Sequence, residues 1–246
     1  MTDRTYREYV ADDDFISEYS EYQKRYADTI RESDRVILDL VRTETTEAPV
    51  TLLDIGCSTG NLLRHLKRAF PSLALVGGDL TPSVLARCRE DPELEGIEFA
   101  ELDILDLPAA RYDVVVANAV LYLLQDDEYA RAAESVAASL RAGGTFIAFD
   151  FFHPFEQDLA IRETSRTHPE GLTLHFRPFS QARAVFERAG FDRVEFHPFE
   201  IPVDLERPTD DAEILSYTVP AADGRRLLYR GTLFQPWCHF VARKPS

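Results

Sequence analysis

Residues 52–61 read LLDIGCSTGN, an apolar run that enters a turn between two glycines, Gly56 and Gly60. The run Val50–Ile55 is short and almost wholly apolar, which predicts a buried strand. Glycines leave room for peptide N–H groups to approach a ligand, and Gly60 opens a helix whose N-terminus carries partial positive charge. The stretch therefore predicts a strand–turn–helix unit that suits a carboxylate or a phosphate.

Toward the C-terminus, apolar strands alternate with amphipathic helices. This alternation predicts an α/β fold with right-handed strand–helix–strand units, and strands that are apolar throughout fit a parallel sheet covered on both faces. The expected strands are Val50–Ile55, Leu73–Gly78, Ile97–Leu102, Asp113–Asn118 and Thr145–Phe151. Three helices are expected between these strands. The first starts at Gly60 and the second spans Pro82–Glu90. The third is capped by Asp126 or Asp127 and stops at Gly143-Gly144.

The segments on either side of this core are less regular. Before it, Ser33 is predicted to cap a helix whose apolar stripe is Val36, Ile37, Leu40 and Val41. After it we expect a helix Ser180–Ala189, a strand Phe191–Phe199, a hairpin around Asp223-Gly224 and a last strand Leu233–Arg243. We therefore expect an N-terminal helical lid at 1–45. The core at 46–246 would carry cover segments at about 152–179 and 200–230.

Composition excludes several classes of function. The chain has 246 residues, with 27 Lys and Arg against 43 Asp and Glu, and a formal net charge of −16. So negative a surface repels a phosphate backbone, which argues against nucleic acid as a partner. The longest near-apolar run, Val114–Leu124, is too short to span a membrane, and the residues after Met1 lack the apolar core of a secretory signal. Three cysteines without a CxxC pair fit a reducing compartment. We expect a cytoplasmic monomer or homodimer.

Polar side chains close the successive strands. Asp79 ends the second strand, where an acid can accept hydrogen bonds from both hydroxyls of a ribose. Asp103 ends the third strand and can accept from an exocyclic amine, while Ile104 can pack on the attached ring. Asn118 ends the fourth strand. Because the carboxyl ends of parallel strands meet at one edge of the sheet, these side chains are predicted to form one nucleoside-binding site.

Five pieces of the chain, taken in order, resemble the class I S-adenosylmethionine-dependent methyltransferases that act on small molecules. They are LLDIGCSTGNLL (52–63), GGDLTPSVL (77–85), AELDILDLP (100–108), YDVVVANAVLYLL (112–124) and LRAGGTFIAFDFF (140–152). The resemblance implies a Rossmann-like doubly wound sheet in three α/β/α layers, mostly parallel with an antiparallel last strand. It also implies S-adenosylmethionine as the cofactor and a helical lid at the N-terminus.

The resemblance implies a role for each matching position. The turn from Gly56 to Gly60 would hold the methionine part of the cofactor, Asp79 the ribose and Asn118 the region of the sulfonium. The adenine would lie against Asp103 and Ile104. The implied cofactor residues are Asp54, Gly56, Cys57, Ser58, Gly60, Asp79, Leu80, Asp103, Ile104 and Asn118. Ser58 departs from the pattern, because many relatives carry a third glycine there.

The acceptor is less defined by the sequence. The residues from Asn118 to Leu121 lack the Asn-Pro-Pro-aromatic pattern of relatives that methylate DNA bases or glutamine, which favours a small molecule. His153 follows the fifth strand and is a candidate for removing the acceptor's proton, although a loop histidine without a role is the alternative. Asp126 and Asp127 are read as helix-capping residues rather than as metal ligands.

The N-terminal segment carries further candidates. Tyr19, Tyr22 and Tyr26 share one helical face and are predicted, with Arg31, to contact the substrate or to close over the cofactor. Ordinary packing of an amphipathic helix is the competing interpretation of the tyrosines, and a solvated side chain is that of the arginine.

Four functions compete for this sequence. Methyl transfer to a small molecule is the leading one. The second is cyclisation of S-adenosylmethionine itself, which would release methylthioadenosine from the same fold. A non-enzymatic nucleotide-sensing module is the third. A nicotinamide-dependent oxidoreductase would share the glycine turn, but Asp103-Ile104 and the missing third glycine argue against it.

Overall fold

The computed structural model describes residues 7, 23, 29–45, 50–165, 168–211 and 214–246. In the described residues the main sheet has nine strands, seven of which lie in the spatial order β3-β2-β1-β4-β5-β12-β8. Their bounds are β1 Thr51–Ile55, β2 Ala74–Asp79, β3 Glu98–Glu101, β4 Tyr112–Asn118, β5 Leu140–His153, β8 Arg193–Pro198 and β12 Trp237–Arg243. The helices are α3 Glu32–Glu44, α4 Asn61–Ala69, α5 Pro82–Glu90, α6 Asp126–Ser139 and α7 Phe179–Arg188, with single 3-10 turns η1 Pro92–Leu94 and η2 Leu121–Leu123.

Strand directions confirm the expected mixed sheet. β1 pairs in parallel with β2 and β4, and β3 and β5 extend the parallel part on either side. β12 is antiparallel to both β5 and β8, between which it lies. The strand order reverses between β1 and β4, and open α/β sheets bind ligands at the carboxyl ends of strands beside such a reversal.

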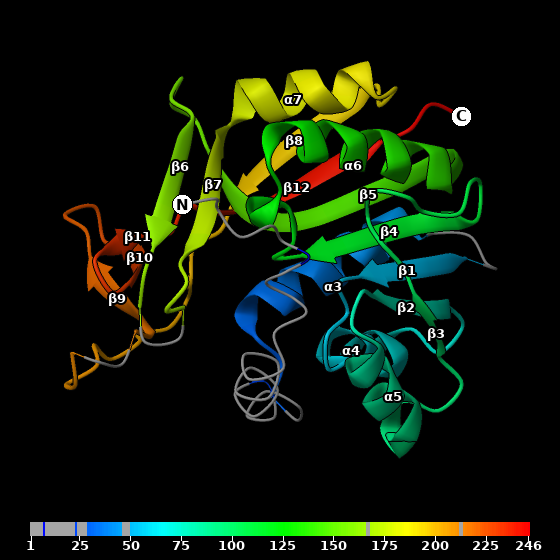
Figure 1. Cartoon of the computed structure of the whole chain (residues 1–246), viewed down its shortest axis with the longest axis horizontal. Helices are drawn as coiled ribbons and strands as arrows, with labels where there is room; N and C mark the ends of the chain where they lie inside the picture. The colour runs from blue at the N-terminus through cyan, green and yellow to red at the C-terminus, as the bar shows by residue number, and fades with distance from the viewer. Residues whose placement is uncertain (1–6, 8–22, 24–28, 46–49, 166–167, 212–213) are drawn as a thin grey trace.

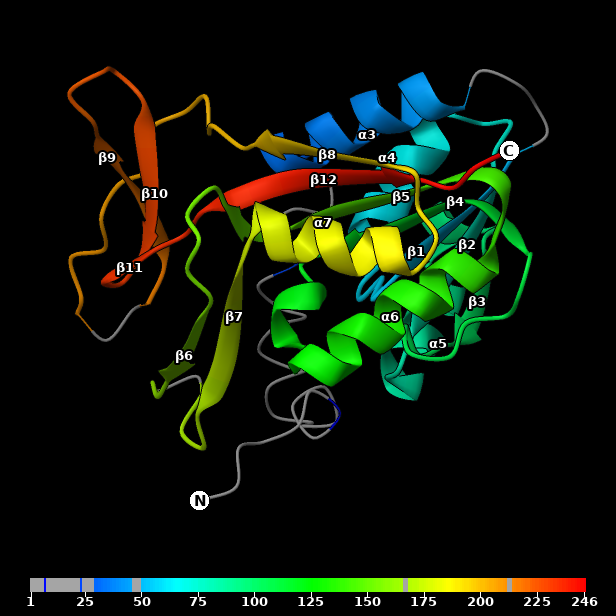
Figure 2. The same ribbon diagram turned by 90° about the horizontal axis from the view of Figure 1, so that it is seen from above.

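Helices cover both faces of the sheet, as expected of three layers (Figures 1 and 2). α3, α4 and α5 lie on one face, and α6 and α7 lie on the other. Each layer buries its own apolar cluster against the sheet. On the first face the helices contribute Ile37, Leu38, Val41, Leu62, Leu63, Leu66, Val84, Leu85 and Cys88, and on the second Tyr129, Ala132, Ala133, Val136, Ala182, Val185 and Phe186.

Two small elements extend the core at the end to which the parallel strands point (Figure 1). β6 (Leu159–Glu163) and β7 (Leu172–Pro178) form an antiparallel hairpin, and the end of β7 pairs with the end of β5. β9 (Ser216–Pro220), β10 (Arg226–Arg230) and β11 (Leu233–Phe234) form a separate sheet. The hairpin at Asp223-Gly224 is thereby confirmed, whereas the β6–β7 hairpin was not anticipated within 152–179.

Several predicted boundaries are wrong for identifiable reasons. Arg31, not Ser33, is the N-cap of α3, and Gln125 precedes α6, so Asp126 is its first helical residue. α6 ends at Ser139, because β5 already starts at Leu140 and passes through the glycine pair that was expected to stop the helix. The last strand is interrupted before Trp237, where Pro236 has no N–H to donate.

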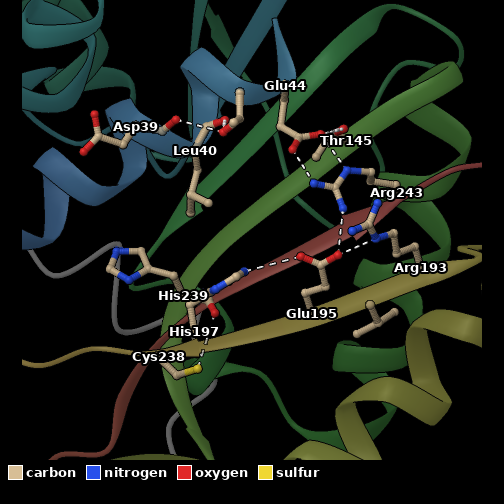
Figure 3. A network of polar contacts seen from close by, with 12 residues as sticks. Asp39, Leu40, Glu44, Thr145, Arg193, Glu195, His197, Cys238, His239 and Arg243 are labelled. Carbon is tan, nitrogen blue, oxygen red and sulfur yellow. Dashed lines mark hydrogen bonds and ion pairs between the residues drawn. The ribbon is translucent and has the colours of Figure 1, made fainter.

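α3 is fastened to β12 at both of its ends. Near its start, the Nε2 atom of His239 donates to the carbonyl of Ser33 at 3.0 Å. At its end, Arg243 donates to Glu44 through Nε at 2.7 Å and reaches Glu195 of β8 at 3.1 Å (Figure 3). These bonds set the position of α3 over the sheet, and α3 carries side chains of the candidate site.

Neither a membrane span nor a disulfide is found in the described part of the chain. None of its helices combines the length and the apolar character that crossing a bilayer requires. All three cysteines, Cys57, Cys88 and Cys238, are buried free thiols.

The His239 contact predicts loss of stability in acid. Burial lowers the pKa of His239 from 6.5 to about 4, so between these pH values the unfolded chain takes up the proton more readily than the folded one. The contribution of neutral, buried His239 to the free energy of unfolding is complete above pH 6.5 and is lost as the pH falls toward 4. It amounts to at most about 3 kcal/mol.

We expect His239→Gln, which keeps a donor but does not titrate, to lack this component. Free energies of unfolding from urea titrations between pH 4 and 8 measure it as the difference between wild type and variant. A constant difference across that range would contradict the assignment.

Candidate functional site

The candidate site lies at the carboxyl ends of β1, β2 and β4, where the chain turns from each strand into the next element. The turn after β1 passes between the end of β2 and the segment after β4. Gly56 N donates to Gly78 O at 2.7 Å, and Val120 lies against Gly56. The predicted site residues on these three strands are therefore brought together at one edge.

The glycine turn needs glycine for its own backbone and packing. Gly56 has φ +75° and Gly60 has φ +74°. A Cβ on Gly56 would come within 2.7 Å of Val120 Cγ2, and one on Gly60 within 2.6 Å of Leu94 Cδ1. Ser58 also adopts a positive φ, 48°, which L-residues disfavour and glycine tolerates. A glycine at this position would adopt the same backbone angle without strain.

Most peptide N–H groups of the turn are used inside the protein, which corrects the expectation that they point freely at a ligand. Gly56 and Cys57 both donate to Gly78 O, and Gly60 donates to Cys57 O at 2.9 Å. Ser58 N donates to the Oδ2 atom of Asp79 at 2.9 Å. The turn is thus held rigid by the end of β2. The first turn of α4, whose N–H groups have no partner within the helix, remains as the natural donor set for an anion.

Asp54 is the most constrained polar residue of the site. It is 2% exposed, and its Oδ2 atom has no hydrogen-bond partner among the described residues. Burial raises its pKa well above the usual value, and the charges of Asp34 and Asp79 raise it further. A cation placed beside it would relieve both effects. The buried hydroxyl of Thr59, in the glycine turn, likewise has no partner in the part of the chain described.

Asp79 lies at the end of β2, as predicted, and its carboxylate has hydrogen-bond acceptor positions that remain free for further donors. Its Oδ2 atom accepts from Ser58 N and its Oδ1 atom accepts from Thr81 N, both at 2.9 Å. A carboxylate has about four acceptor positions, so these two bonds leave room for two more donors such as a vicinal diol. The backbone bonds also hold the carboxylate in one orientation.

Asp103 lies just beyond β3 and is fixed in the same way. Its Oδ1 atom accepts from Leu105 N at 2.9 Å, and its Oδ2 atom pairs with Arg7 from the N-terminal segment. Ile104 beside it is 3% exposed, and Leu80 packs against the same core cluster. An amine that replaced Arg7 would meet the same carboxylate oxygen.

Asn118 ends β4 and joins the site to α3. Its Nδ2 atom donates to the Oδ1 atom of Asp34 at 3.0 Å. Asp34 is 4% exposed, and burial raises its pKa above the ordinary value although Arg31, Asn118 and His65 lower it. Two carboxyl groups, Asp34 and Asp54, therefore share the interior of the site with Asn118.

Arg31 contacts the start of α4 through Gln23. Its Nη2 atom donates to Gln23 Oε1 at 2.8 Å, and Asn61 Nδ2 donates to Gln23 O at 2.9 Å. Gln23 itself is buried. Tyr19, Tyr22 and Tyr26 lie outside the described residues, so the lid assigned to them stays a prediction.

His153 is the last residue of β5 and is 7% exposed. Its Nε2 atom lies 3.4 Å from Phe176 O, under β7, while its Nδ1 atom has no partner among the described residues. Aromatic rings surround the neighbouring strand ends. Trp237 lies 4.2 Å from Phe151 and 4.6 Å from Phe149, between ring centroids. A proton-accepting role for His153 stays a prediction.

Sequence reasoning missed Asp34, Gln23 and Thr59. Asp34 had one available signal, because it occupies the buried stripe of α3 together with Ile37, Leu38 and Val41. A charged residue on an apolar face requires a polar partner. Gln23 and Thr59 carried no comparable pattern. Among the described residues, no group of three or more His, Cys, Asp or Glu side chains is placed to hold a metal ion.

Known proteins share this site-bearing region. A family model described as a methyltransferase domain matches residues 52–144. A trans-aconitate 2-methyltransferase of Methylobacterium nodulans is 34% identical over 114 residues, 46% of this chain and 43% of that one. A malonyl-(acyl-carrier protein) O-methyltransferase of Acetivibrio thermocellus is 27% identical over 150 residues, 60% of this chain and 50% of that one. The chain spans about half the length of these curated relatives or less.

Solved structures extend the likeness to the whole fold. The Burkholderia thailandensis 1,6-didemethyltoxoflavin-N1-methyltransferase, with bound 1,6-didemethyltoxoflavin and S-adenosylhomocysteine, has a TM-score of 0.60 at 18% identity. It covers 95% of this chain and 86% of its own. An S-adenosylmethionine-dependent methyltransferase from Mesorhizobium loti has a TM-score of 0.55 at 19% identity. The match covers 84% of this chain and 96% of that one. At these identities the likeness concerns the fold alone.

The packing of the glycine turn can be tested by substitution. We expect Gly56→Ala to destabilise the protein by about 1–3 kcal/mol, because alanine disfavours a positive φ and its Cβ would collide with Val120. Gly96→Ala is the matched control, because Gly96 has φ +85° with nothing within 4 Å of its Cβ position. Urea unfolding of both variants separates the backbone cost from the collision, and equal losses would contradict the Val120 contact.

Proposed function

We propose, from the premise that this chain belongs to the class I S-adenosylmethionine-dependent methyltransferases, that it transfers a methyl group to a small-molecule acceptor. The observation that carries the proposal is the convergence of Asp54, Asp79 and Asn118 at the ends of β1, β2 and β4, with Asp103 just beyond β3. Their chemistry fits the separate parts of the cofactor of this family.

The donor set fits S-adenosylmethionine from one end to the other. Asp79 keeps two acceptor positions for the ribose hydroxyls, and Asp103 with Ile104 suits the amine and the ring of adenine. The unpartnered oxygen of Asp54 calls for a cation such as the ammonium of the methionine part. The first turn of α4 suits the carboxylate of that part.

When bound, S-adenosylmethionine supplies a methyl group on a positively charged sulfur, and transfer leaves S-adenosylhomocysteine. The chain's own contribution is alignment of the acceptor with that methyl group, which is worth about 7–11 kcal/mol without a dedicated acid or base. Asn118 and Asp34 hold one another at the methionine end of the proposed site. His153 is retained as the proposed proton acceptor for nucleophiles that require one.

The acceptor is proposed to be a small molecule rather than a nucleic acid. Of the relatives named above, one is named for trans-aconitate, a small carboxylic acid, and the other for a malonyl group carried by a protein. The net charge of −16 disfavours a nucleic acid as the acceptor, because it repels a phosphate backbone. Cyclisation of the cofactor is not favoured, because both of these relatives are named methyltransferases.

The reaction products decide the function. We expect the protein, given S-adenosylmethionine and a panel of small acceptors, to form S-adenosylhomocysteine only when a suitable acceptor is present. Mass spectrometry of the nucleoside products measures this directly. Methylthioadenosine formed from the cofactor alone would overturn methyl transfer in favour of cyclisation.

Cofactor binding is tested at Asp79. We expect Asp79→Ala to weaken S-adenosylhomocysteine binding by about 1.5–3 kcal/mol, since a charged acceptor of two hydroxyl hydrogen bonds is lost. Isothermal titration calorimetry gives the affinity. Asp113→Ala is the matched control, because Asp113 also accepts a backbone N–H, from Thr51 at 2.8 Å, but at the opposite edge of the sheet. Affinities of Asp79→Ala and wild type within twofold would contradict the ribose assignment.

A further inference from the structure

We propose that Asp150 and Arg177 are positioning residues of the transfer site, which together fix the turn 119–124 between the cofactor side and the acceptor side. The consequence for catalysis rests on the proposed function, whereas the mechanical role does not. Neither residue belongs to the region of cofactor contacts described above. Arg177 comes from β7, in the cover hairpin, and Asp150 from the end of β5.

The turn 119–124 has little of its own to hold it. It begins at Ala119, which has φ 61° although it is not glycine, and continues into the single 3-10 turn η2. Its internal hydrogen bonds are long, 3.3 Å from Leu123 N to Val120 O and 3.2 Å from Leu124 N to Leu121 O. Such short 3-10 segments bond poorly, so the conformation must be imposed from outside.

Asp150 holds the beginning of η2. Its Oδ2 atom accepts from Leu121 N at 2.7 Å, and its Oδ1 atom accepts from Phe151 N at 2.8 Å. The side chain is 1% exposed. Burial raises the pKa of Asp150 to about 7, although these backbone donors and the nearby Arg177 charge lower it.

Arg177 holds the end of the same turn. It donates to Leu121 O at 3.2 Å through Nη1, and to Leu124 O at 2.6 Å through Nη2. The second nitrogen also reaches Asp126, the first residue of α6, at 3.2 Å. Its guanidinium lies 4.1 Å from the ring centroid of Tyr129, and the residue is 1% exposed. The residue Leu121 is thus held at its N–H by an acid and at its C=O by a guanidinium.

The turn 119–124, which Asp150 and Arg177 hold in place and which we call the clamped turn, carries side chains that point to two sides. Val120 packs against Gly56 of the glycine turn, on the cofactor side. Tyr122 packs its ring 5.1 Å from Phe151 and 6.2 Å from Trp237, on the side of the cover elements. A shift of η2 would therefore move the ring of Tyr122 and loosen the wall behind Gly56 together.

Stability alone does not account for a buried guanidinium and a buried carboxyl group here. Burying an ionisable group costs free energy, whereas a guanidinium can bond two carbonyls at once in a fixed direction. We therefore infer that Asp150 and Arg177 serve to hold the backbone of the turn 119–124 in one conformation. It also connects the cover hairpin, which lies outside the matched methyltransferase region 52–144, to the turn beside the cofactor.

Three variants test the clamp: Arg177→Met, Arg177→Lys and Asp150→Asn. Hydrogen exchange followed by mass spectrometry reports directly on the peptide containing residues 119–124. We expect at least tenfold faster exchange of that segment in Arg177→Met, and a smaller increase in Arg177→Lys, which keeps the charge but not the fork. Asp150→Asn should accelerate exchange at its beginning, because the amide offers a single acceptor oxygen where the carboxylate accepts from both Leu121 N and Phe151 N.

The single tryptophan of the chain gives a second reading that needs no acceptor. Trp237 contacts Tyr122 and Phe151, so its emission reports on the ring cluster beside the turn. We expect a shift of the emission maximum in Arg177→Met and a partial return toward wild type in Arg177→Lys. Arg243→Met is the matched control, since it removes a half-buried arginine with two ion pairs at the opposite edge of the sheet.

The functional consequence is measured once an acceptor has been found. We expect Arg177→Met to lower kcat at least tenfold and to change the affinity for S-adenosylhomocysteine less than threefold, with intermediate kcat for Arg177→Lys. The clamp would be overturned if exchange, emission and kcat in Arg177→Met equalled those of Arg243→Met at matched stability. Failure of the protein to bind S-adenosylhomocysteine would refute the proposed function while leaving the exchange and emission results to decide the mechanical role.

Discussion

The carboxylate of Asp54, buried at the end of β1 with one oxygen lacking a partner, is the constraint on which the site depends. A charge in that position is costly unless a cation or a donor accompanies it. Two neighbouring acids, Asp34 and Asp79, add to the cost rather than relieve it. Burial and these charges raise the pKa of Asp54, so its carboxyl group favours the neutral form unless a cation lies beside its Oδ2 atom. A ligand that brought a cation to this position would therefore stabilise the folded protein.

The rigidity of the site comes from hydrogen bonds within the protein, made by groups that could otherwise bind a ligand. N–H groups of the glycine turn donate hydrogen bonds to Gly78 and Asp79, so the shape of the turn is set before any ligand binds. The same bonds orient the carboxylate of Asp79. Packing of Val120 on Gly56 then joins the turn to the segment after β4. Pre-organisation of this kind reduces the entropy lost on binding.

Two additions to the common core make contacts at the candidate site or beside it. α3 brings Asp34 to Asn118 and is itself fastened to β12 through Ser33 and Glu44. The β6–β7 hairpin brings Arg177 to the turn after β4. Neither element lies within the matched region 52–144, which contains the strand ends that carry Asp54, Asp79 and Asn118.

The sequence by itself determined the core and the strand ends that carry the candidate site. Strand and helix periodicity identified the parallel strands and predicted Asp79, Asp103 and Asn118 at their ends. Asp79 and Asn118 end β2 and β4, and Asp103 lies just beyond β3. Those features are local, since a residue's position along a strand decides where it lies in a parallel sheet. Only the tertiary structure decided that the amides of the glycine turn are used internally, that Asp34 meets Asn118, and that Arg177 reaches Leu121. These contacts join residues far apart in the chain, and no local pattern specifies which distant groups a buried side chain will meet.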